Sequence, residues 1–156
     1  MGAHEAWFEL TVGDRGEPDY VFTAALTRAQ REVLWQFRTC VTELKDVEAI
    51  EAELNAALAD PSREGVYSYT YQGDWWLDFR CDGRRAVLSI SFDSEAEGDD
   101  RYPNPARPLD MPLAEFAEFF RAWAASVRHW QSLGGRTGYP LPADQRPTHY
   151  PPLRNA

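Results

Sequence analysis

The chain of 156 residues contains few of the features that mark specialised classes of protein. Its two cysteines, Cys40 and Cys81, are too few for a disulfide framework, and we interpret both as small buried hydrophobic residues. No apolar run approaches the roughly 20 residues of a membrane-spanning helix. The N-terminus lacks the basic start and the apolar core of a signal peptide. These absences predict a cytoplasmic protein without membrane contact.

Positive charge is also scarce. Lys and Arg number 16 against 25 Asp and Glu, which gives a formal net charge of −9 and an isoelectric point of about 4.8. Long-range repulsion of a phosphate backbone therefore argues against nucleic acid as a partner. Residues 1–133 hold 24 acidic and 13 basic residues, whereas residues 134–156 hold one acidic and three basic residues. We expect the basic tail to lie on the acidic body.

The sequence lacks the common motifs of catalytic and cofactor sites. It contains no Gly-rich phosphate loop, no Gly-x-Ser-x-Gly elbow and no Cys-x-x-Cys pair. The histidines His4, His129 and His149 do not have the spacing of a metal-binding pair, and we interpret them as structural or surface residues. We therefore predict no cofactor, no bound metal and no catalytic residue.

What the chain does have is the composition of one globular domain. Hydrophobic residues make up 44% and charged residues 26%, and a domain of this length buries enough surface to fold without a disulfide or a metal. We expect a single α+β domain over residues 1–133, followed by a Pro-rich tail over residues 134–156 that packs on it.

Hydrophobic periodicity predicts the secondary structure. Alternating or short apolar runs predict strands over residues 7–12, 20–25, 65–72, 75–81 and 84–93. Spacings of three and four predict helices over residues 28–42, 46–59 and 113–133. The buried stripe expected on the last helix is Leu113, Phe116, Ala117, Phe120, Trp123, Ala124, Val127 and Trp130. The order β-β-α-α-β-β-β-α predicts a two-layer α+β fold, with helices on one face of an antiparallel sheet of about five strands and an extended tail.

Two hairpin turns decide which side chains face the core. The dipeptide Asp82-Gly83 suits a two-residue type I′ turn. The pairs that this turn creates are Phe79–Ala86, Leu77–Leu88 and Trp75–Ile90, all of them apolar.

The preceding turn has two interpretations. A two-residue turn at Gly73-Asp74 pairs Tyr71 with Trp76 and leaves an exposed aromatic face that includes Tyr67 and Tyr69. A three-residue loop that starts at Gln72 pairs Tyr71 with Trp75 instead and directs the tyrosines into the core. We favour the second, because a large exposed aromatic patch is costly without a partner.

Residues 93–100 are the most distinctive stretch of the chain. Acidic residues at alternate positions followed by glycine resemble the start of a calcium-binding loop. The twelfth position is Asn104, where a calcium loop needs a bidentate glutamate, and Arg101 stands among the would-be ligands. We interpret the stretch as a solvated loop or as a contact for a protein rich in Arg and Lys.

The small size, the acidity and the absence of catalytic motifs are typical of immunity proteins and other stoichiometric inhibitors, although no motif identifies a family. We expect a non-catalytic module that neutralises a basic toxin or nuclease by masking its surface. The expected partner-binding residues are Asp93, Glu95, Glu97, Asp99 and Asp100 for electrostatic attraction, with Tyr71 and Trp76 as aromatic anchors.

The alternative function is a small-ligand-binding domain, or an enzyme with an unrecognised carboxylate pair. Asp78 with either Asp82 or Glu95 is an example of such a pair. The sequence gives no indication of the oligomeric state.

Overall fold

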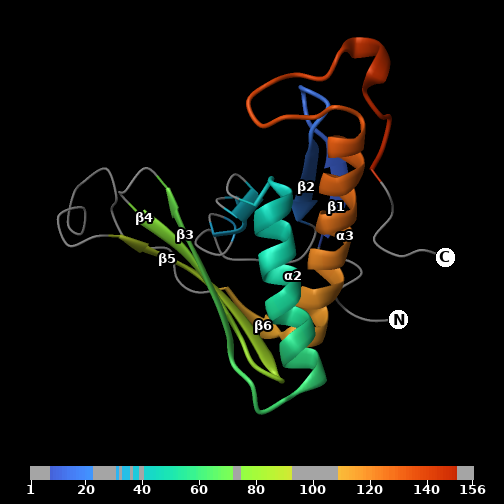
Figure 1. Cartoon of the computed structure of the whole chain (residues 1–156). Coiled ribbons are helices and arrows are strands. Elements are labelled where there is room, and N and C mark those ends of the chain that lie inside the picture. Colours follow the sequence, from blue (N-terminus) through green and yellow to red (C-terminus); the bar gives the residue numbers. More distant parts are fainter. Residues whose placement is uncertain are drawn as a thin grey trace.

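The structure is a computed structural model that describes residues 8–22, 31, 33–35, 37–38, 41–71, 75–92 and 109–150 (Figure 1). For residues 8, 22, 68–71, 75–78 and 89–92, only the backbone is described. The elements in chain order are β1 (Phe8–Val12), β2 (Pro18–Phe22), the helical residues 31, 33–35 and 37–38, α2 (Leu44–Ala59), β3 (Gly65–Tyr71), β4 (Trp75–Cys81), β5 (Arg85–Phe92), β6 (Leu109–Pro112), α3 (Leu113–Ser132) and the short 3-10 helix η2 (Ala143–Gln145).

The predicted α+β class is confirmed. Strands β3 to β6 form a four-stranded antiparallel sheet in chain order, and β1 pairs with β2 in a separate two-stranded sheet. Helices α2 and α3 lie next to each other on one face of the larger sheet (Figure 1). Helix α3 contacts strands of both sheets. The strands expected in one sheet are thus divided between two, with α3 in contact with each.

The predicted apolar stripe of α3 is buried along its whole length. The helix also buries Phe119, Ala122 and Ser126, which lie outside that stripe. Because α3 contacts the two-stranded sheet as well as the larger one, its buried face is wider than a helix lying on a single sheet requires.

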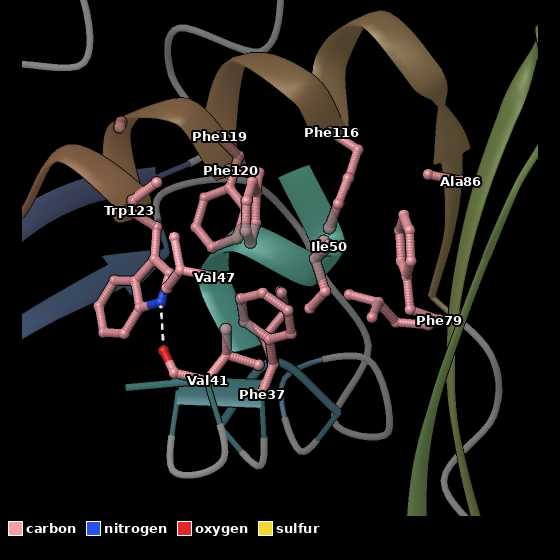
Figure 2. Packing of buried hydrophobic residues seen from close by; sticks show 14 of the residues in the cluster. Phe37, Val41, Val47, Ile50, Phe79, Ala86, Phe116, Phe119, Phe120 and Trp123 are labelled. Atoms are coloured by element: carbon pink, nitrogen blue, oxygen red, sulfur yellow. Dashed lines mark hydrogen bonds between the residues drawn. The ribbon is translucent and has the colours of Figure 1, made fainter. Parts of the chain in front are cut away.

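Aromatic rings fill the space between α3, the first helical segment and the larger sheet (Figure 2). The ring of Phe116 stacks on Phe79 with centroids 5.2 Å apart and meets Phe37 edge-on at 6.2 Å. The indole of Trp123 donates its N–H to the carbonyl of Val41 at 2.7 Å. Edge-on and offset ring pairs add to the stability that area burial provides. This cluster therefore joins distant parts of the chain.

Between β3 and β4, Tyr71 pairs with Trp75, which is the pairing expected from the favoured interpretation. Tyr67, whose side chain is described, packs against the core. Its hydroxyl donates a hydrogen bond to the carboxylate of Asp46, a buried residue in the first turn of α2. The side chains of Tyr69 and Tyr71 lie outside the described residues.

The predicted register between β4 and β5 is wrong by two residues. Phe79 pairs with Leu88, and Cys81 pairs with Ala86. Gly83 is not among the described glycines with positive φ, so the turn is not the expected type I′. The carboxylate of Asp82 accepts the backbone N–H groups of the residues two and three positions later, at 2.7 and 2.9 Å. These two hydrogen bonds favour a turn one residue later in the chain than the one expected. Because the register shifts by two residues, each residue stays on the face of the sheet that was expected.

Replacing Asp82 with alanine is expected to lower the melting temperature, because two turn amides lose their acceptor. Bonds from the N–H groups of Arg85 and Arg84 lower the pKa of the Asp82 carboxyl. The stabilisation is therefore present above the unfolded-state pKa of about 3.9 and is lost as the pH falls through the lower folded-state value. Thermal melts of Asp82→Ala and of the exposed control Asp144→Ala check this. A deficit for Asp82→Ala that does not shrink below a pH of about 4 would contradict the assignment.

Strand β6 was not predicted, and it ends directly before the helix expected from residue 113. Its residues alternate between buried and exposed and pair with the start of β5. The guanidinium of Arg85 bonds Asp110 at 2.7 Å across the two strands. Pro112 stands at the end of an edge strand, where the missing N–H removes no ladder bond.

Element ends differ from the prediction by a few residues. Strand β2 begins at Pro18 rather than Tyr20, and α2 begins at Leu44 rather than Asp46. The first helical segment ends before Val41.

Among the described residues, no helix combines the length and the apolar character needed to cross a membrane.

Candidate functional site

The expected partner-binding residues are only partly described. Asp93, Glu95, Glu97, Asp99 and Asp100 lie outside the described residues, and so do the side chains of Tyr71 and Trp76.

The backbone register nevertheless separates the two expected anchors. Tyr71 pairs with Trp75, whereas Trp76 pairs with Thr70. Because successive strand positions face opposite sides of a sheet, the positions of Tyr71 and Trp76 belong to different faces. The exposed patch that joined them required Tyr71 to pair with Trp76, which the register contradicts.

A surface that the sequence did not predict lies at the end of α3, where the chain returns to the β1–β2 turn. That turn spans Gly13 to Glu17 and is closed by a bond from the N–H of Gly13 to the carbonyl of Glu17 at 2.8 Å. Gly16 has a φ of 83°, and an added Cβ would lie 2.9 Å from Cγ of Arg146. Only glycine accommodates both the left-handed backbone and this close approach.

The segment after α3 packs on this turn (Figure 1, orange to red against blue). The N–H of Leu141 donates to the carbonyl of Arg15 at 2.9 Å, and the guanidinium of Arg146 donates to the carbonyl of Asp14 at 3.0 Å. Tyr150 donates its hydroxyl to the carbonyl of Gly16. Leu141 and Tyr150 are buried. The described contacts of Arg146 are thus to carbonyl groups and not to acidic side chains.

A cavity of about 550 Å³ lies between the β1–β2 turn, the end of α3 and the segment that follows it. Its lining residues are Val12, Gly13, Asp14, Arg15, Glu17, Pro18, Asp19, Arg38, Thr42, Trp130, Arg136, Thr137, Gly138 and Tyr139. A second cavity of about 430 Å³ shares Arg136 and Thr137 with it. Volumes of this size are typical of sites for small molecules.

Two exposed aromatic side chains accompany this cavity. Tyr139 is 61% exposed, and the guanidinium of Arg136 lies 4.9 Å from the centroid of its ring. Trp35 is 51% exposed, and the guanidinium of Arg38 lies 5.6 Å from its ring. Both arginines line the cavity. We call these four residues the aromatic rim.

The charges that line the cavity are formally balanced, with three arginines and three carboxylates. Asp19 and Arg38 form an ion pair at 2.5 Å. One carboxylate oxygen of Glu17 accepts the backbone N–H of Arg15 at 3.2 Å. Beside the cavity, burial and then the negative charge of Glu17 raise the pKa of Tyr150.

Other candidate groups in the described part of the chain have structural partners. Cys81 is buried, its thiol lies 3.6 Å from the carbonyl of Glu53, and burial raises its pKa. His129 is exposed and meets the ring of Tyr150 edge-on. Within the described ranges, no three His, Cys, Asp or Glu residues are grouped as metal ligands would be. Cys40 and His4 are outside these ranges.

The sequence did not predict this site, because the residues that form it are far apart in the chain. On sequence alone, residues 13–19 indicate only a turn, and Gly134-Gly135 indicates only the end of a helix. The sequence offered only a local signal for this site, which is a glycine between an arginine and a tyrosine. Gly138, with a φ of 85°, lies between Arg136 and Tyr139. The two ends of this tight turn form an isolated β-bridge.

We compared the chain with protein-family models, with curated proteins and with solved structures, and none of the three comparisons finds a match.

Proposed function

We propose that this chain is a non-catalytic protein-binding module that masks the surface of a basic partner, as inhibitors of toxins and nucleases do. The formal net charge of −9 supports a basic partner, because a field of one sign accelerates the approach of the opposite charge. The proposal concerns the class of partner and not its identity.

The observation that carries this proposal is the aromatic rim. Protein interfaces are enriched in Trp, Tyr and Arg, and a few such residues supply most of the binding energy. The rim combines Trp35 and Tyr139, each more than half exposed, with arginines whose guanidinium groups lie over their rings. These rings present large apolar areas with little conformational entropy to lose on binding.

Electrostatic attraction in this proposal comes mainly from residues 93–100, which include five acidic residues. Many carboxylates in the described part of the chain are already neutralised by arginine or lysine. Examples of carboxylates in ion pairs are Asp19, Glu43, Glu51, Glu53, Glu64 and Asp110. Paired carboxylates contribute less to the field that a distant partner meets.

The experiment is affinity capture from a lysate of the source cells with the immobilised chain and with two rim variants, Trp35→Ser and Tyr139→Ser. The control is Val66→Ser, because Val66 is 48% exposed on β3 and does not line the cavity. We expect one basic protein to be retained by the wild-type chain and the control. Each rim variant is expected to bind it about 30-fold more weakly, the loss typical of an interface hot spot.

Equal retention by the rim variants and the wild type would contradict the role of the rim. Circular dichroism of each variant separates lost binding from lost folding.

A further inference from the structure

The indole N–H of Trp130 has no hydrogen-bond partner among the described residues, although Trp130 is only 2% exposed. Trp123 lies two turns earlier on the same buried face. In contrast to Trp130, it donates its indole N–H to the carbonyl of Val41. A buried donor without an acceptor is costly, and native proteins rarely keep one without a reason.

Trp130 lines the larger cavity, and Gly135 lies over its five-membered ring. A Cβ added at Gly135 would be 2.3 Å from Nε1, 2.4 Å from Cδ1 and 2.4 Å from Cε2. Nearly equal distances to three ring atoms place Gly135 above the ring face. An indole N–H lies in the plane of the ring. Gly135, above the ring, therefore does not block an acceptor that approaches along the N–H bond.

Arg136 brings further donors to the same cavity. Its guanidinium lies over the ring of Tyr139 and forms no ion pair with a carboxylate of the described residues. The other lining arginines are engaged, since Arg38 pairs with Asp19 and Arg15 bonds the carbonyl of Gly138 at 3.4 Å. A guanidinium that has no ion-pair partner keeps N–H groups available for a planar oxyanion.

We propose that this cavity binds a small organic carboxylate, whose oxygens accept the indole N–H of Trp130 and the N–H groups of Arg136. The ring of Tyr139 and the apolar groups of Val12 and Pro18 line the same cavity and suit the organic part of the ligand. A singly charged carboxylate fits better than a phosphate. The lining carries three carboxylates of its own, which repel a doubly charged anion more strongly.

This inference does not rest on the protein-binding proposal, because its test needs only the isolated chain. The full chain is labelled with ¹⁵N, and the indole N–H signals of its six tryptophans are recorded during titration with benzoate. Trp130→Phe assigns the signal of interest. Benzamide, which has the same shape without the charge, and inorganic phosphate are titrated in parallel.

We expect benzoate to shift the Trp130 signal in a saturable way and Arg136→Gln to weaken benzoate binding about tenfold to a hundredfold. Arg121→Gln, an exposed control on α3 that does not line the cavity, should leave the affinity unchanged. If Trp130→Phe does not fold, triple-resonance experiments on the chain labelled with ¹³C and ¹⁵N assign the Trp130 indole signal.

Three results would overturn the proposal. The first is a Trp130 signal that benzoate does not move, and the second is an equal response to benzamide. The third is phosphate binding in preference to benzoate, which would show a different anion site.

Discussion

Replacing Trp123 with alanine is expected to lower the free energy of unfolding by about 3–5 kcal/mol, the cost of deleting a large buried ring. Trp123 is fully buried, and its ring meets Tyr20 edge-on with centroids 5.2 Å apart. Its N–H is the donor for the carbonyl of Val41, just after the first helical segment. The substitution removes contacts that connect β2, α3 and the chain leading into α2. Urea denaturation followed by circular dichroism measures the change.

Two controls separate the contributions at this position. Trp123→Phe keeps much of the ring volume but leaves the carbonyl of Val41 without its donor, so a loss of about 1–3 kcal/mol is expected. Trp35→Ala removes the same kind of side chain from an exposed position, and about 0.5 kcal/mol or less is expected. Similar losses for Trp123→Ala and Trp35→Ala would show that the aromatic core is not packed as described.

Replacing Tyr150 with alanine is expected to cost about 3 kcal/mol, because it leaves a cavity where a ring is buried. Tyr150 is 3% exposed and bonds the carbonyl of Gly16, so it holds the end of the described tail on the β1–β2 turn. Tyr150→Phe, which removes only the hydroxyl, should cost about 1–2 kcal/mol. Tyr139→Ala is the matched control, since Tyr139 is exposed on the same segment. Urea denaturation of the four proteins compares them.

The same tyrosine predicts a pH dependence. Burial raises the pKa of Tyr150 above its ordinary value of about 10. Above that pH the unfolded chain loses a proton that the folded chain keeps. The stabilisation is therefore complete below the unfolded-state pKa and is lost as the pH rises toward the folded-state value. Wild type should lose stability more steeply than Tyr150→Phe above a pH of about 10. Parallel pH profiles would contradict the burial of this hydroxyl.

Local patterns were sufficient to predict most of the fold. The stripe on α3 was confirmed because each of its residues lies at a spacing that only a helix brings to one face. In β4 and β5, the described apolar residues Phe79, Ala86 and Leu88 are buried as expected even though the register was wrong, because a shift of two preserves alternation. Strand β6 was missed because its pairing with β5 comes from residues more than twenty positions earlier.

The candidate site was beyond local patterns for a physical reason. Its hydrogen bonds connect Arg15 to Leu141 and Gly16 to Tyr150, and the hydroxyls of Thr42 and Thr137 meet at 3.0 Å. No periodicity records such contacts. The sequence also could not predict that the indole N–H of Trp130 has no partner among the described residues. It shows only an apolar helix position and not the acceptors around the ring. The sequence did predict the acidity on which the proposed partner class depends.

Capture at low and high salt tests the central claim most directly, with the wild-type chain, Tyr139→Ser and Val66→Ser compared side by side. The account predicts one basic protein, retained at low salt by the wild type and by Val66→Ser, released at high salt, and bound weakly by Tyr139→Ser. Salt sensitivity follows from the net charge of −9, and dependence on Tyr139 follows from the aromatic rim. Failure to retain any basic protein, or equal retention by Tyr139→Ser, would contradict it.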